Sequence, residues 1–148
     1  MKYLIVCIGN RDGGDDAVGP YIADELIKLR LEDIEVLDTG IAPENYTGTI
    51  KQKKPKIVIL VDAVDMNLSP GEIRFVPKEK IGLMHVSTHG IPLSVLMKYL
   101  SQYIKEIKLI GIQPKTMNGP MTYNVIKGAD ELIKKIVNKN FFLIDLLN

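Results

Sequence analysis

Hydrophobic residues recur along this chain with two different spacings, which predict alternating strands and helices. Continuous apolar runs are typical of strands buried on both faces, and they predict strands over residues 3–8, 34–37, 56–61 and 106–112. One alternation of polar and apolar residues is typical of an edge strand, and it predicts a strand over residues 72–76. Helical spacing or a preceding turn predicts helices over residues 17–31, 43–53, 91–104 and 123–138.

This alternation predicts an α/β fold. We expect a three-layer sandwich, with a mostly parallel, twisted sheet of about five strands, one antiparallel edge strand and helices on both faces. The chain has no internal repeat, low-complexity stretch or linker, so residues 1–148 are expected to form a single domain. Sheets of this kind bind ligands at the carboxyl ends of their strands, which directs attention to the segments after residues 8, 37, 61 and 112.

The composition narrows the class of protein. A hydrophobic share of 46% and a charged share of 25% are typical of a soluble globular protein. The net charge of +1 gives no general attraction to nucleic acid or to an anionic membrane. Neither a signal peptide nor an apolar run of the ~18 residues needed to span a membrane is recognisable, so the expected location is the cytoplasm. No exposed apolar seam is evident, and a monomer is expected.

The loop after the first strand, residues 9–20, is rich in glycine and acids. It lacks the Gly-Lys-Ser/Thr of a phosphate loop, and Asp12, Asp15 and Asp16 stand where a phosphate would have to bind. Like charge opposes phosphate there, which argues against a nucleotide site. One of the adjacent acids Asp15 and Asp16 is expected to cap the following helix, leaving the other to face a cleft.

Two more residues join this loop as candidates for metal binding. Asp62 follows the strongest predicted strand, where it either accepts backbone hydrogen bonds or faces the cleft. His89 stands directly before a predicted helix, where a position at the cleft is open to it. Two carboxylates and one imidazole suit a divalent metal such as nickel, zinc or iron, and three protein ligands leave positions for water or substrate.

Other catalytic machinery fits less well. Asp38-Thr39-Gly40 matches the core motif of aspartic proteases, but those enzymes pair two such aspartates in an all-β fold, and this chain has one copy. Asp38 is therefore interpreted as a residue in a turn after the second strand. There is no Gly-x-Ser-x-Gly elbow, and the single cysteine, Cys7, lies in the middle of an apolar strand, where a buried thiol behaves as a small hydrophobe.

Three motifs, in their order and spacing, resemble those of the hydrogenase maturation endopeptidases, and look closest to the branch that processes hydrogenase-3-type enzymes. They are a Gly-Asn loop leading to an acidic pair and Gly-Pro (residues 9–20), a strand ending in Asp-Ala (61–65), and Thr-His before a Pro-Leu helix (87–93). Weaker matches lie at residues 40–45, 70–74 and 111–114. The resemblance implies nickel-binding roles for Asp16, Asp62 and His89.

The resemblance also implies a function. Such a peptidase removes the C-terminal extension from the nickel-loaded precursor of a nickel–iron hydrogenase large subunit. Carboxylates and imidazole without thiolates should hold nickel loosely, so the metal is expected to arrive with the substrate and to bind transiently. The nickel either polarises the scissile carbonyl, lowers the pKa of a bound water, or serves only for recognition. In the last case Asp16 or Asp38 would act as general base.

Three alternatives remain open from the sequence. The same residues would serve a nickel-binding assembly chaperone without peptidase activity. A peptidase of the same fold with another target would cleave without nickel. A dimeric protease using Asp38 would depend on that aspartate and would not depend on His89.

Overall fold

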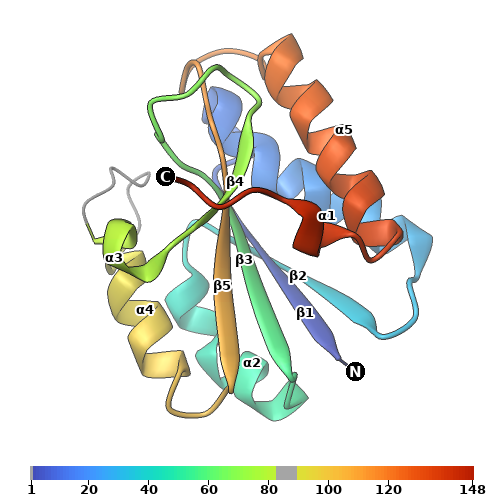
Figure 1. Ribbon diagram of the computed structural model, residues 1–148, viewed down its shortest axis with the longest axis vertical. Helices are drawn as coiled ribbons and strands as arrows, with labels where there is room; N and C mark the ends of the chain where they lie inside the picture. Colours follow the sequence, from blue (N-terminus) through green and yellow to red (C-terminus); the bar gives the residue numbers. More distant parts are fainter. Residues whose placement is uncertain (1, 83–89) are drawn as a thin grey trace.

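A five-stranded sheet forms the centre of the computed structural model, which describes residues 2–82 and 90–148 (Figure 1). In chain order the strands are β1 (Tyr3–Ile8), β2 (Ile34–Gly40), β3 (Ile57–Ala63), β4 (Ile73–Val76) and β5 (Glu106–Ile112). Their order across the sheet is β2-β1-β3-β5-β4. All neighbouring pairs are parallel except β4 and β5, so the antiparallel edge strand predicted over residues 72–76 is confirmed.

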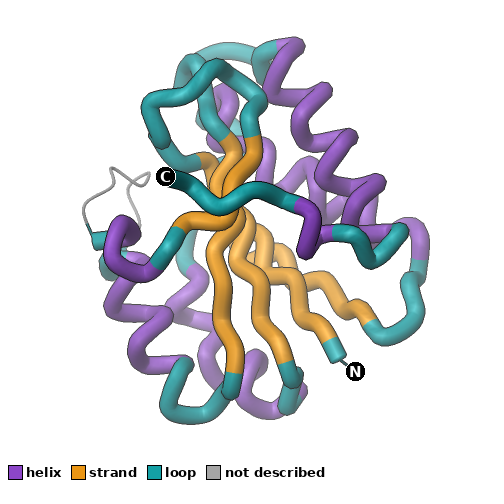
Figure 2. Tube along the Cα trace, in the orientation of Figure 1, coloured by secondary structure: helices purple, strands orange, loops and turns teal. Residues whose placement is uncertain are grey.

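Helices cover both faces of this sheet, which confirms the predicted three-layer architecture (Figure 2). The α-helices are α1 (Val18–Leu29) and α5 (Tyr123–Val137) on one face, and α2 (Thr47–Lys53), α3 (Lys78–Ile81) and α4 (Leu93–Leu100) on the other. The 3₁₀ helices are η1 (Gly14–Ala17), η2 (Pro43–Tyr46) and η3 (Phe141–Leu143). Among the helices of the described residues, none has the length and apolar character needed to cross a membrane.

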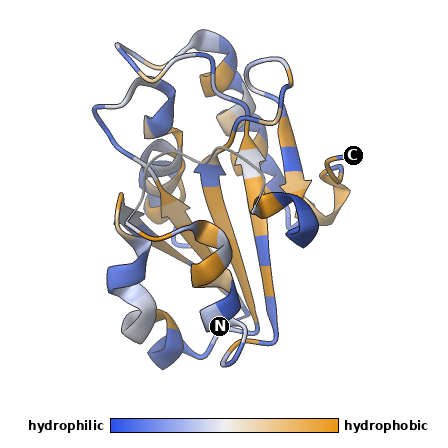
Figure 3. Ribbon diagram, turned by 90° about the vertical axis from the view of Figure 1, so that its left-hand side faces the viewer, coloured by the Kyte–Doolittle hydropathy of each residue, from blue (hydrophilic) through white to orange (hydrophobic). Residues whose placement is uncertain are grey.

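The central strands supply the core on both sides. Side chains of β1 and β3 alternate between the two faces, so Ile5 and Ile59 pack under α1 and α5, whereas Leu4 and Leu60 pack under α2 and α4. All four are almost completely buried, and each such side chain contributes about 1.5–3 kcal/mol of transfer free energy. Figure 3 shows apolar residues concentrated in the central strands. Burial on both faces explains why these strands are continuous apolar runs.

The ends of several elements differ from the sequence prediction. Strand β2 continues to Gly40, so placing Asp38 in a turn was wrong: Asp38 lies within the strand, in register with Cys7 of β1. Strand β3 continues to Ala63 and includes Asp62, in register with Gly111 of β5. These residues have polar side chains, which the apolar pattern leaves out, but pairing with a neighbouring strand keeps their backbone extended.

The helix predicted over residues 91–104 is shorter at both ends. Pro92 has an extended backbone and precedes the first helical residue of α4, and the helix stops at Leu100. The helix predicted over residues 17–31 is α1, which ends where Arg30 adopts the left-handed conformation. Helix α3 and the C-terminal η3 were not predicted.

The C-terminal segment covers the outer edge of β4. The Phe75 amide donates to the Asp145 carbonyl at 2.9 Å, and the Leu147 amide donates to the Phe75 carbonyl, also at 2.9 Å. Upstream, the Phe141 ring is buried and meets Tyr3 edge-on, with ring centroids 4.7 Å apart. An exposed strand edge can pair with other chains, and this segment blocks part of it.

The start of α1 packs directly on the end of β1, which leaves no room for a side chain at Gly19. A Cβ at that position would lie 2.1 Å from the carbonyl oxygen of Ile8. Because that oxygen belongs to a buried strand, Gly19→Ala is expected to destabilise the fold by about 3 kcal/mol. Urea denaturation provides the measurement.

Gly48→Ala in α2 is the matched control, because a Cβ there meets nothing within 4 Å. It is expected to leave stability unchanged or raise it by about 0.5–1 kcal/mol, since alanine favours a helix. Equal effects of the two substitutions would contradict this account of the packing.

Candidate active site at the carboxyl edge of the sheet

Two of the three predicted metal ligands lie in segments that meet at the carboxyl edge of the sheet. Asp16 lies in η1, directly after the loop that leaves β1, and η1 packs against β3, the strand that carries Asp62. Across the loop, the Gly9 amide donates to the Gly40 carbonyl at 2.9 Å, which ties the ends of β1 and β2 together. His89 falls outside the described residues, so its predicted role stays a prediction.

Asp15 has a structural role that the sequence did not indicate. Its carboxylate is completely buried and accepts hydrogen bonds from the amides of Lys115, Thr116 and Thr122 and from the Thr122 hydroxyl, at 2.6–3.0 Å. Burial, the largest single influence, opposes ionisation of Asp15, but these hydrogen bonds together outweigh it and lower its pKa. Asp15 thus joins the loop after β1 to the segment between β5 and α5.

Asp16 is the acid of this pair that keeps an oxygen available. Its Oδ2 accepts a hydrogen bond from the Asn10 amide at 3.0 Å. Its Oδ1 is buried and has no hydrogen-bond partner among residues 2–82 and 90–148. The expectation that one of the two acids caps the helix was wrong: α1 has Ala17 at its N-cap, and neither η1 nor α1 has a side-chain cap. Asp15 instead bonds to the segment between β5 and α5, and Asp16 to the loop that precedes η1.

The segment following Asp62 is held in place by Gln113. The Gln113 Oε1 accepts from the amides of Met66 and Leu68 at 2.6 and 3.2 Å, and its Nε2 donates to Asp65 at 3.1 Å. Asp62 itself is completely buried. A glutamine at the end of a strand carries no pattern of its own, and only the fold shows that Gln113 shapes the turn after Asp62.

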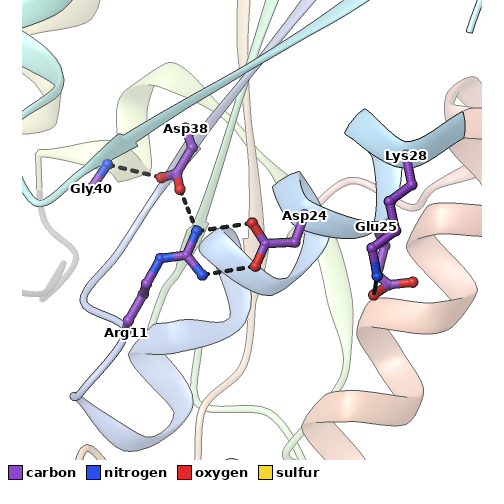
Figure 4. A network of polar contacts seen from close by, with 6 residues as sticks. All are labelled: Arg11, Asp24, Glu25, Lys28, Asp38 and Gly40. Atoms are coloured by element: carbon purple, nitrogen blue, oxygen red, sulfur yellow. Dashed lines mark hydrogen bonds and ion pairs between the residues drawn. The ribbon is translucent and has the colours of Figure 1, made fainter. Parts of the chain in front are cut away.

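Asp38 belongs to a network centred on Arg11 (Figure 4). The Arg11 guanidinium donates to both oxygens of Asp24 at 2.7 and 2.9 Å and to Asp38 Oδ2 at 2.7 Å. The other oxygen of Asp38 accepts from the Gly40 amide at 3.0 Å. The hydrogen bond from Arg11 is the main cause that lowers the pKa of Asp24. Both oxygens of Asp38 are therefore already engaged, which gives little support to a role as general base.

Glu44, at the start of η2, was not singled out from the sequence. Its Oε1 is buried and has no hydrogen-bond partner within the described part of the chain. Its Oε2 lies beside Gly90, only 2.5 Å from where a Cβ on that residue would be. Glu44 thus places a carboxylate next to the residue that directly follows His89. The only sequence signal was its membership in the weakly matching segment 40–45.

Cys7 offers no nucleophile. The thiol is completely buried in β1, and burial, with smaller contributions from Asp38 and Asp24, raises its pKa far above the ordinary value. A thiol that remains protonated and inaccessible is unreactive. The prediction that Cys7 is a buried core residue is confirmed.

The described donors fit a divalent metal only in part. Within residues 2–82 and 90–148, no group of three or more His, Cys, Asp or Glu side chains is arranged to hold an ion. Asp16 fits such a role, because its buried Oδ1 is an anionic oxygen without a partner inside the described chain. Any complete ligand set therefore needs a donor from outside these residues or from the substrate.

Comparison with known proteins gives consistent matches along nearly the whole chain. A family model described as hydrogenase maturation protease matches residues 20–139. The hydrogenase 3 maturation protease of Escherichia coli K12 is 38% identical over 136 residues, which are 90% of this chain and 86% of that protein.

Solved structures agree with this result. The solution structure of the E. coli endopeptidase HycI superposes with a TM-score of 0.91 at 31% identity, covering 100% of this chain and 97% of the other. The crystal structure of a NiFe hydrogenase maturation protease HycI from Thermococcus kodakarensis gives a TM-score of 0.83 at 33% identity, covering 94% and 92%.

Proposed function

Because the chain belongs to the hydrogenase maturation protease family, we propose that this endopeptidase removes the C-terminal extension from the nickel-loaded precursor of a nickel–iron hydrogenase large subunit. Family membership establishes a hydrolase of hydrogenase maturation. The substrate, the dependence on nickel and the position of the cut are the proposed parts.

The single observation that carries the proposal is the unpartnered oxygen of Asp16. A buried anionic oxygen costs free energy unless a donor or a cation compensates it. Asp16 Oδ1 lacks a hydrogen-bond donor within the described residues, and η1, which carries Asp16, packs against the strand that bears Asp62. A cation delivered by the substrate would supply the missing partner.

The proposed site binds the nickel that the precursor carries. Asp16 and Asp62 would offer carboxylate oxygens and His89 an imidazole, a donor set without thiolates that suits transient contact with a substrate-borne ion. An ion at this position would supply Lewis acidity toward the scissile carbonyl. The protein's own task is to hold these side chains in place, with Gln113 shaping the turn after Asp62 and Asp15 joining η1 to the segment beyond β5.

Incubation of the purified protein with the precursor, with and without nickel, tests the proposal directly. We expect a C-terminal fragment to be released only from the nickel-loaded precursor, observed as a loss of mass. Cleavage indifferent to nickel would contradict the metal-reading role and favour a different target. Binding without cleavage would indicate an assembly chaperone.

A further inference from the structure

Three lysines line one cavity on the face of the molecule that carries α3 and α4. Lys78 begins α3, Lys98 lies in α4, and Lys105 precedes β5. The cavity has a volume of about 200 Å³ and no acidic side chain in its lining. We call it the lysine groove.

Within residues 2–82 and 90–148, no acidic side chain neutralises the charges of the lysine groove. All three lysines are exposed, and none forms an ion pair with an acid of the described chain. The whole protein carries a net charge of only +1, so this clustering is a local feature. Beneath the lysines the groove is lined by apolar side chains, those of Ile81, Met97 and Ile107. A complementary partner would present carboxylates at the rim and apolar side chains toward the floor.

The groove continues beyond these lysines. A second cavity of about 280 Å³ shares Lys78, Met97, Lys105 and Ile107 with the first. A third, of about 260 Å³, shares Phe75, Glu106 and Lys108 with the second and reaches η3. Its acid, Glu106, lies 3.6 Å from the Lys108 ammonium. Three adjoining cavities suit an extended polypeptide better than a small anion.

Exposed apolar residues of the C-terminal segment lie along the same path. Leu146 lines the second cavity and Phe142 the third, and both keep more than half of their surface exposed. The segment therefore buries Phe141, Ile144 and Leu147 and leaves Phe142, Leu143 and Leu146 exposed. This extends the apolar part of the groove past the strand edge that the segment covers.

The groove is remote from the candidate active site. Glu106, which directly follows Lys105 and lines the two adjoining cavities, is in register with Ile57 of β3, five residues before Asp62 on that strand. At a rise of about 3.3 Å per residue, that separation is roughly 17 Å. A partner bound in the groove can therefore reach the active site only if it is a long chain or a folded protein.

We propose that the lysine groove is a second substrate-binding surface, which holds an acidic, partly apolar segment of the precursor while its C-terminal extension is cut at the carboxyl edge of the sheet. This inference rests on the proposed function for the identity of the partner. Its physical basis, unpaired lysines over an apolar floor, is independent of the cleavage chemistry.

The test replaces Lys78, Lys98 and Lys105 together with glutamine. Its matched control replaces Lys56, Lys127 and Lys134, which are also exposed, have no acidic ion-pair partner in the described chain and lie outside the groove. Both variants lose three positive charges. With nickel-loaded precursor, the groove variant is expected to raise KM about tenfold at low salt with kcat unchanged, and the control to leave both unchanged.

A second measurement does not require cleavage. A fluorescent peptide of about twelve alternating Glu and Leu residues is titrated by anisotropy against the three proteins. We expect salt-sensitive binding to wild type and control, and loss of binding to the groove variant.

The outcomes separate the two proposals. Failure of the wild type to cleave nickel-loaded precursor would overturn the proposed function, while the peptide titration would still decide the groove. Normal cleavage with the same KM in both variants would contradict the proposal that the lysine groove binds the precursor. A groove that binds a single-stranded oligonucleotide and not the acidic peptide would overturn it as well.

Discussion

The Asp15→Ala variant is expected to lose about 3 kcal/mol of folding free energy. The substitution removes the acceptor for three backbone amides and one hydroxyl and leaves the amides of Lys115, Thr116 and Thr122 without their buried partner. Solvent reaches part of this segment, so the loss of folding free energy is smaller than the sum for three fully buried amides without partners. Urea denaturation followed by circular dichroism measures it, with the exposed Asp12→Ala as control.

The same variant should change the pH dependence of stability. The folded-state pKa of Asp15 is lowered, so its contribution is present above the unfolded-state pKa of about 3.9 and is lost as pH falls through the folded value. Wild type is therefore expected to lose stability below about pH 4, whereas Asp15→Ala should show a shallower decline there. Identical acid profiles of the two proteins would contradict the assignment of Asp15 as an ionised structural anchor.

Asp16→Asn is expected to reduce cleavage of nickel-loaded precursor about 100-fold or more, with folding stability changed by less than about 1.5 kcal/mol. The amide oxygen can still accept from the Asn10 amide, so the loop keeps its hydrogen bond. The negative charge is lost, however, and the side-chain nitrogen cannot donate electrons to a metal. The measurements are kcat/KM for the precursor and the affinity of the protein for added nickel.

Asp12→Asn is the matched control for this substitution, because Asp12 lies in the same loop with its side chain exposed. Full activity of the Asp16→Asn variant would contradict a role for Asp16 in the proposed site. A loss of activity with a large loss of stability would instead give Asp16 a structural role like that of Asp15. Substitution of Asp15 is thus expected to lower stability, and substitution of Asp16 to lower activity.

The arrangement of the molecule follows from local patterns. Continuous apolar runs identified β1 and β3, because a strand covered by helices on both faces has no polar side to show. Alternation identified β4 at the edge, and helical spacing identified α1 and α5. The family motifs in the loop after β1 and at the end of β3 identified Asp16 and Asp62 as candidate metal ligands from the sequence. The structure places their segments at one edge of the sheet.

Roles that depend on distant partners needed the tertiary structure. Asp15 and Asp16 are neighbours with the same side chain, yet Asp15 bonds to residues one hundred or more positions away and Asp16 keeps an oxygen without a partner in the described chain. Asp38 was misplaced in a turn, because pairing with β1 and the bond to Arg11 are invisible to a local pattern. Gln113 and Glu44 had no periodic signal at all.

The sequence by itself therefore determined the order of the five strands and of α1, α2, α4 and α5, and which of their faces are apolar, because burial repeats every two residues in strands and about every 3.6 in helices. Only the tertiary structure decided which buried acid anchors the fold, which one keeps an oxygen without a hydrogen-bond partner in the described chain, and which lysines converge on one groove. The physical reason is that hydrogen bonds and charges act over a few ångströms in space, and folding brings together groups that the chain keeps far apart.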